Sequence, residues 1–222
     1  MSSSHALAHS ATVLLLLAQE ERHRPTSKTP TNHYSEHALG AITLLVSAFD
    51  AWLIETLAQR GLRTKSELTA IERYQELELR ALTANDSPHP TTNLGLVIEV
   101  RNDIEHFRPG QSATTHGLPD YLALLLPLGV LGDSLFHAEH DGIPYTPPLH
   151  ERLKSYALAY WVFEVVESAV VALALRLAPG QPLMAANFTS FRAVYSPATL
   201  AEHDREPCPG VVAKVIDFSL GG

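Results

Sequence analysis

The residues of this chain that are best placed to do chemistry are Arg101, Asn102 and His106, in the stretch LVIEVRNDIEHFRPG. A guanidinium binds anions and an imidazole exchanges protons near neutral pH, so the three could form a small reactive site. Pro109 and Gly110 end the stretch. With 12 arginines and 12 histidines in 222 residues, an Arg-x4-His pair arises by chance roughly 0.65 times, so its weight depends on the element that carries it.

That element is predicted to be an amphipathic helix. On a helical wheel one arc of roughly 100° holds five apolar residues, as in a core-facing stripe: Leu96, Val97, Val100, Ile104 and Phe107. Asn102 and His106 lie on the opposite side, while Arg101 and Glu105, four residues apart, lie on a flank where they can pair. Arg101 and His106 are about 140° apart. They share a site only if the Arg101 side chain reaches round or a partner helix completes the cleft. The alternative is an ordinary solvated helix face with a surface ion pair.

Composition limits the class of protein. The chain has 222 residues, 45% of them hydrophobic, which is enough for one medium domain with an extension. Its net charge of −8 argues against binding nucleic acid mainly through a strong positive field, so any such contact needs a local basic patch. The single cysteine, Cys208, excludes an intrachain disulfide and suits a reducing cytoplasm. No stretch is expected to span a membrane, because 11–18 is too short and 161–178 carries Glu164 and Glu167.

Periodicity, caps and turn residues predict a mainly helical chain. Helices are expected over 3–22, 36–60, 66–82, 94–108, 121–140 (kinked at Pro127) and from Pro147 and Pro148 to 178. Ser35 is a plausible N-cap, and Gly61 a stop, for the second of these. The segments 188–195 and 211–218 alternate in part and would suit a small hairpin or an arm packed on the helices. The expected division is 1–32 (helix and basic linker), 33–180 (helical domain) and 181–222 (extension).

The helix predicted over 36–60 contains an acidic residue that needs a partner. The helix is apolar almost all round, yet Thr43, Ser47 and Asp50 interrupt it on one face. A carboxylate in a largely buried position requires a cation or hydrogen-bond donors. Arg101, on the flank of another core helix, is the partner that the sequence suggests. The alternative is that Asp50 faces water along a narrow exposed stripe.

Two histidine groups could bind a metal. Residues 33–37 (HYSEH) have the His-x-x-Glu-His order of inverted zinc peptidases, but they begin in a turn-rich linker. His137 and His140 are three apart on a predicted helix with acidic neighbours, where a solvent-facing helix end is the alternative. No P-loop, GxSxG, GxGxxG or paired CxxC motif occurs. The linker position of the first histidine group and the solvent-facing alternative for the second favour no metal site, and the missing motifs favour no cofactor.

The arrangement of these segments resembles the HEPN superfamily of small helical proteins. The likeness rests on a long apolar helix with an acidic residue (LLVSAFDAWLIETL) followed by an apolar helix containing RNDIEH, and it covers about residues 36–178. The family hallmark, Arg-x4–6-His with a polar residue after the arginine, is matched by Arg101, Asn102 and His106. The resemblance implies an all-α, up-and-down helical bundle that forms a homodimer with the two motif helices facing each other.

The resemblance also implies an activity. Many members are metal-independent endoribonucleases, often toxins or defence effectors. For this chain we therefore expect an RNA substrate, a cytoplasmic location and, if it is a toxin, an antitoxin partner. Arg101 and His106 would then be catalytic, Asn102 and Arg108 would bind RNA, and Asp50 and Glu105 would support them. In metal-free RNA cleavage the 2′-hydroxyl attacks the adjacent phosphate, which His106 could assist as base or acid and Arg101 could bind. Other members serve as non-catalytic dimerisation or interaction modules, which is the alternative function.

Overall fold

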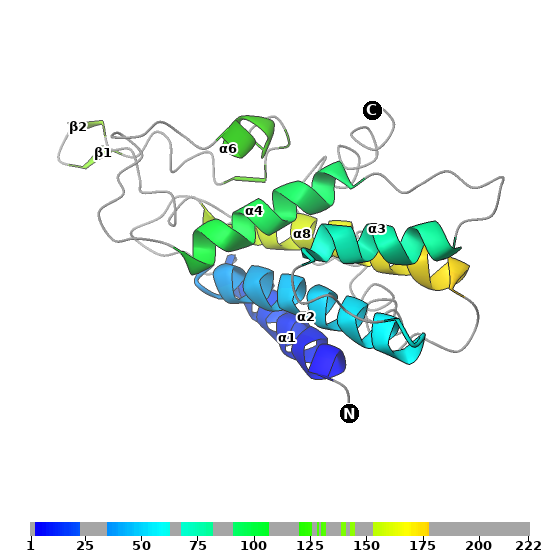
Figure 1. The fold of residues 1–222 in the computed structure, drawn as a ribbon. Coiled ribbons are helices and arrows are strands. Elements are labelled where there is room, and N and C mark those ends of the chain that lie inside the picture. The colour runs from blue at the N-terminus through cyan, green and yellow to red at the C-terminus, as the bar shows by residue number, and fades with distance from the viewer. Residues whose placement is uncertain are drawn as a thin grey trace.

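The computed structural model describes residues 3–22, 35–62, 68–81, 91–106, 120–125, 128, 130–131, 139–140, 143–144 and 153–177. Within these ranges the helices are α1 (Ser3–Arg22), α2 (His37–Gln59), α3 (Ala70–Ala81), α4 (Thr92–Glu105), α6 (Asp120–Leu125) and α8 (Tyr156–Arg176) (Figure 1). The strands β1 (Glu139–His140) and β2 (Ile143–Pro144) pair antiparallel. The described part of the chain is mostly helical, which confirms the all-α prediction.

Two helices keep the predicted bounds closely. α1 spans the predicted 3–22, and α2 ends where Gly61 was expected to stop it. Gly61 has φ +68°, its N–H donates to the Ala58 carbonyl (3.0 Å), and the N–H of Leu62 donates to Leu57 (3.0 Å). This is a Schellman turn, which favours glycine because φ is positive there. Ser35 lies one residue before the N-cap, and its hydroxyl accepts the N–H of His37 (3.1 Å).

Two other helices begin later than predicted, because side-chain caps fix their starts. α3 begins at Ala70 rather than 66, after a capping box in which Glu72 accepts the Thr69 N–H (2.7 Å) and Thr69 accepts the Glu72 N–H (3.3 Å). α8 begins at Tyr156 rather than at Pro147. Its N-cap, Ser155, is extended (φ −119°, ψ 126°) and accepts the N–H of Leu158.

The helix predicted over 121–140 is wrong in its second half. α6 ends at Leu125, two residues before Pro127, whose ring is incompatible with a continuing helix. Glu139 and His140 form β1 instead, paired with β2. His140 is therefore not on a helix face, and His137 lies outside the described residues. The extension predicted over 181–222, with its expected hairpin, also lies outside them.

α1 and α2 form a close antiparallel pair. The buried residues of α1 repeat at alternating intervals of four and three, like one side of a coiled coil, and most are small: Ser4, Ala8, Ala11, Leu15 and Ala18. The close approach is visible at Gly40, where an added Cβ would lie 2.9 Å from Leu14 Cδ1. α1, predicted as a segment outside the helical domain, thus contributes to the same hydrophobic core as the other helices.

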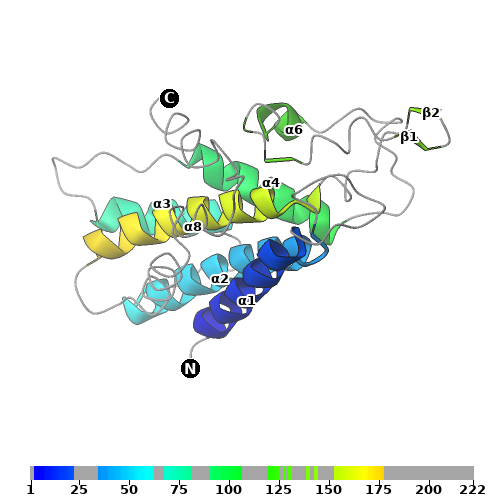
Figure 2. The same ribbon diagram turned by 180° about the vertical axis from the view of Figure 1, so that it is seen from behind.

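α2 and α8 form the centre of the bundle and run in the same direction. Where both begin, the N–H of Ser35 donates to the Lys154 carbonyl (3.0 Å). Where both end, the Arg60 guanidinium donates to the Leu177 carbonyl. α8 lies behind α3 and α4 in Figure 1 and in front of them in Figure 2. It is buried along most of its length, which follows from its almost unbroken apolar sequence.

α3 also runs in the direction of α8. The Tyr74 hydroxyl donates to the Ala169 carbonyl (3.4 Å). Further along both helices in the same direction, about one turn on α3 and about two on α8, Arg176 pairs with Glu78 (2.7 Å). α2, α3 and α8 are therefore parallel, and the up-and-down order expected for α2 and α3 is wrong.

Both central helices are long and apolar enough to cross a membrane by length and composition. The most apolar window of α2 is 50% buried inside the molecule, and that of α8 is 78% buried. Core helices of water-soluble proteins share this property, so it identifies the two helices as the most apolar elements and goes no further. α8 also contains two buried acidic residues, Glu164 and Glu167.

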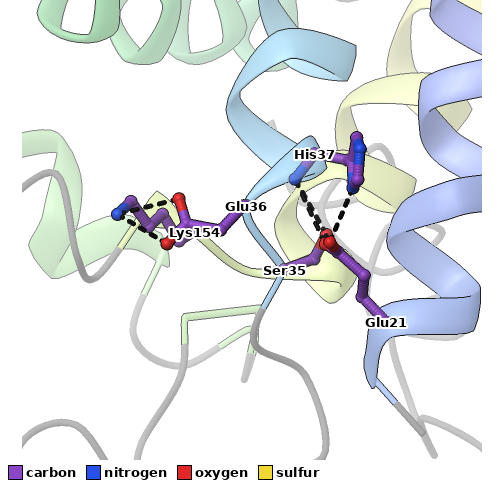
Figure 3. A network of polar contacts seen from close by, with 5 residues as sticks. All are labelled: Glu21, Ser35, Glu36, His37 and Lys154. Carbon is purple, nitrogen blue, oxygen red and sulfur yellow. Dashed lines mark hydrogen bonds and ion pairs between the residues drawn. The ribbon is translucent and has the colours of Figure 1, made fainter. Parts of the chain in front are cut away.

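A polar cluster fastens the end of α1 to the start of α2 (Figure 3). The Glu21 carboxylate accepts the Ser35 hydroxyl and the His37 N–H (3.3 Å) and lies 2.8 Å from His37 Nδ1. Burial alone would raise the pKa of Glu21, but these hydrogen bonds and the nearby imidazole lower it below its ordinary value. On the other side of the start of α2, Glu36 pairs with Lys154 (3.0 Å).

Replacing Glu21 with glutamine is expected to cost about 1–2 kcal/mol at neutral pH, the contribution of hydrogen bonds to a charged group. Because folding lowers the pKa of this carboxyl, its stabilisation is complete above the ordinary value of 4.5 and is lost as the pH falls through the folded value. The free energy of unfolding, measured in urea from pH 7 to pH 3, should therefore fall less with acid in Glu21→Gln than in the wild type. Glu20→Gln, an exposed neighbour with the same charge change, should keep the wild-type slope. A wild-type slope in both variants would contradict the lowered pKa.

Candidate functional site

The motif residues lie on α4, whose apolar stripe fixes which face they present. Leu96, Val97 and Val100 are buried and Ile104 packs partly against the core, as the wheel predicted, while Phe107 lies outside the described residues. α4 packs against α2 and α8, and its C-terminal end lies at the end of the bundle where those two helices begin (Figures 1 and 2). The opposite face of α4 is thereby turned away from the core.

Arg101 is held on the flank of α4 by Glu105. Its Nη1 lies 2.7 Å from Glu105 Oε2, and the two side chains are 26% and 31% exposed. The pair that the i, i+4 spacing predicted is thus confirmed. The Nε atom of Arg101 is buried and has no hydrogen-bond partner among the described residues. Within the described part of the chain the guanidinium is thus held through Nη1, while the unpaired Nε is closed off from solvent.

Asn102 and His106 are exposed on the outer face of α4. His106 is the C-cap of the helix, and its N–H donates to the Asn102 carbonyl (2.8 Å), so the two lie one turn apart on the same face. α4 therefore ends at Glu105, earlier than the predicted 108. Arg108, the other predicted RNA-binding residue, lies outside the described residues. Arg101 and His106 are presented in different directions, as the wheel predicted, so one α4 alone does not converge them.

Tyr121 of α6 contacts the same helix, and sequence reasoning missed it. Its hydroxyl donates to the Asp103 carboxylate. Burial, together with the bond to Asp103 and the charges of Asp103 and Glu99, raises the pKa of the Tyr121 phenol far above its ordinary value, so it stays a neutral donor. The contact joins residues 18 apart in the sequence, and no periodicity or spacing marks such a pair.

Acidic groups outnumber cations on α4. Within Thr92–Glu105 the carboxylates are Glu99, Asp103 and Glu105, and the single cation is Arg101. An anionic ligand that reached Arg101 would meet these carboxylates, which oppose it within about a Debye length of 8–10 Å. Any phosphate-binding surface here requires cations from outside α4.

Asp50 does not pair with Arg101, and this prediction is wrong. Its ion pair is with Arg73 of α3, whose side chain is 11% exposed against 33% for Asp50. Asp50 therefore helps to fix α3 on α2, beside the ring contact of Phe49 and Tyr74 (centroids 6.0 Å apart). Arg73 sits on an otherwise charged helix, and the sequence does not distinguish it from its exposed neighbours.

Replacing Arg73 with methionine is expected to destabilise the protein by about 1–3 kcal/mol, because the Asp50 carboxylate loses its cation in a partly buried position. A double-mutant cycle of Arg73→Met with Asp50→Asn, followed by urea unfolding, should give a coupling energy of about 1 kcal/mol or more. The cycle of Arg101→Met with Asp50→Asn is the matched control and should give a value near zero. Coupling in the second cycle alone would contradict the arrangement seen here.

Of the histidines considered as metal ligands, His37 and His140 lie in the described part of the chain, and neither belongs to a metal-binding group there. Among the described residues no group of three or more His, Cys, Asp or Glu side chains could hold a metal ion. His37 lies against Glu21 instead, in the cluster between α1 and α2, and His33 lies outside the described residues.

Comparisons of this chain with models of known protein families, with curated protein sequences and with solved structures found no match.

Proposed function

We propose that this chain is a HEPN-type endoribonuclease that cleaves RNA without a metal ion. The observation that carries the proposal is the placement of His106 and Asn102, exposed and one turn apart at the C-terminal end of α4, with Arg101 held on the neighbouring flank. These side chains are free of the core, although the helix that carries them is anchored in it. That combination of a rigid element and accessible polar groups is what catalysis requires.

The chemistry assigns each residue a task. The 2′-oxygen of the RNA forms a bond to the adjacent phosphorus while the bond from phosphorus to the 5′-oxygen breaks, leaving a 2′,3′-cyclic phosphate and a 5′-hydroxyl. His106 takes the proton of the 2′-hydroxyl or gives one to the leaving 5′-oxygen. Arg101 binds the phosphate and stabilises the charge that develops on it. Asn102 and Arg108 contact the RNA beside the reacting group.

A complete site would be built from two copies of the chain. The reaction needs both a base and an acid, but one α4 supplies one histidine, and its arginine points elsewhere. In a homodimer with the two α4 helices facing each other, the second copy supplies the other proton-transfer group and a second Arg101. We propose such a dimer, acting in the cytoplasm as a toxin or defence effector, which an antitoxin partner could restrain.

The acidic surface of α4 favours a second candidate function, a non-catalytic helical dimerisation module. Three carboxylates beside one arginine are a poor surface for RNA, whereas Arg101 and Glu105 can serve a protein interface. In that case Arg101→Ala lowers the stability of the dimer and no RNA is cut. Incubation of the purified protein with single-stranded RNA in EDTA separates the two functions, because only the nuclease gives cleavage products without a metal.

A further inference from the structure

The described helices contain two Glu–Arg pairs at i, i+4 spacing, and the two differ in order. On α3, Glu76 precedes Arg80, with 3.1 Å between the charged atoms. On α4, Arg101 precedes Glu105, at 2.7 Å. An acid placed before its base complements the helix dipole, whereas the reverse order opposes it. The α3 pair therefore suits helix stability, and the α4 pair does not.

Glu105 is also unfavourably placed by itself. It is the last residue of α4, where the exposed carbonyl groups give the helix end a partial negative charge that repels a carboxylate. Two further carboxylates, Glu99 and Asp103, lie within two turns of it. Helix stability therefore offers no reason for an acid at this position. What Glu105 does is occupy one nitrogen of Arg101, at a distance typical of a strong charge-assisted bond.

We propose that Glu105 occupies, in the free protein, the place on Arg101 that a phosphodiester of single-stranded RNA takes, so that RNA binds by displacing it. This inference rests on the proposed function, because it concerns what limits RNA binding at that same site. A carboxylate and a phosphate both present paired oxygens to a guanidinium, so one can stand in for the other. Among the described residues Glu105 contacts Arg101 through Nη1 (2.7 Å), and the two side chains are 26% and 31% exposed, so this contact lies within reach of a phosphate from solvent.

The consequence is that Glu105 lowers the affinity of the site for RNA. An exposed ion pair of this kind contributes little, so displacing it is easy and the restraint is modest. Removing the carboxylate leaves the guanidinium on its flank of α4 with the Nη1 donor freed. Glu105→Gln should therefore bind RNA about two- to fivefold more tightly than the protein with Glu105 intact. Added salt should narrow this difference in affinity, because screening weakens the Arg101–Glu105 pair that competes with RNA.

The test uses the full chain with His106→Ala, so that binding is measured without cleavage. The probe is a fluorescein-labelled single-stranded RNA oligonucleotide, followed by fluorescence anisotropy in EDTA at low salt. Glu105→Gln is compared with two variants that carry the same charge change: Glu76→Gln, which removes the other i, i+4 pair, and Glu99→Gln, which removes an acid from α4 without releasing Arg101. Both controls should give the affinity of the parent within about 1.5-fold, since neither acid pairs with Arg101.

Tighter binding by Glu105→Gln alone, lost again when Arg101→Ala is added, is the expected result. Equal gains in all three variants would show a general effect of charge and would overturn the proposal, as would unchanged or weaker binding by Glu105→Gln. A parallel assay of RNA cleavage with intact His106 keeps this question apart from the proposed function. If the protein cleaves RNA but Glu105→Gln binds RNA no more tightly, the displacement by RNA is refuted and the nuclease stands. If Glu105→Gln binds RNA more tightly but the wild type does not cleave it, the nuclease is refuted and the displacement stands.

Discussion

Replacing His106 with alanine is expected to lower RNA cleavage in EDTA by about a hundredfold or more, the share that a positioned acid or base contributes to proton transfer. The fold should be unaffected. His106 is exposed at the end of α4, and its bond to Asn102 comes from the backbone N–H, which alanine keeps. The change in the free energy of unfolding should stay within about 0.5 kcal/mol, so a loss of cleavage could not be ascribed to unfolding.

The measurement compares three proteins purified in parallel and incubated with single-stranded RNA in EDTA. His9→Ala is the matched control, because His9 is also exposed on a helix but lies on α1, away from α4. Wild type and His9→Ala should cut at the same rate while His106→Ala does not. Equal cleavage by all three would point to a contaminating nuclease and refute the role of His106. Cleavage by none would leave the dimerisation module, for which the effect of Arg101→Ala on dimer stability is the next observation.

The parts of this fold that follow from local rules could be predicted from the sequence. The face that α4 buries was set by the phase of Leu96, Val97 and Val100, and the end of α2 by Gly61, since both depend on residues within two turns. The starts of α3 and α8 could not be placed in the same way. Each is preceded by several residues able to begin a helix, and the hydrogen bonds of Thr69 and Ser155 decide between them.

In the candidate site, too, contacts within one helix could be predicted from the sequence, and contacts between helices could not. The Arg101–Glu105 pair lies within one turn of one helix, so spacing alone was enough to predict it. The partner of Asp50 depends on which helix packs beside α2, and the parallel course of α3 brings Arg73 rather than Arg101 to that place. The Tyr121–Asp103 contact needs the path of the chain between α4 and α6. Sequence patterns predict which residues share a helix face, and tertiary packing decides which faces meet.

α1 shows why a helix can be predicted without its orientation, and it gives the second large effect. Its central run VLLLL places apolar residues on every side, so the sequence does not say which leucine enters the core. In the structure Leu15 is fully buried, whereas Leu17, two residues on and rotated by about 160°, is 37% exposed. The two leucines thus have the same chemistry and the same helix but opposite surroundings.

Leu15→Ala is therefore expected to destabilise the protein by about 2–5 kcal/mol, through lost burial and the cavity left between α1 and α2, and Leu17→Ala by less than about 1 kcal/mol. The midpoint and slope of unfolding in guanidinium chloride measure both. A much larger loss of unfolding free energy in Leu15→Ala than in Leu17→Ala means that α1 belongs to the core of the helical domain and is not part of a separate N-terminal segment. Equal, small costs would contradict this packing, since an undocked α1 loses nothing from either leucine. Equal, large costs would mean that the outer face of α1 is covered as well, as it would be if a second copy of the chain packed there.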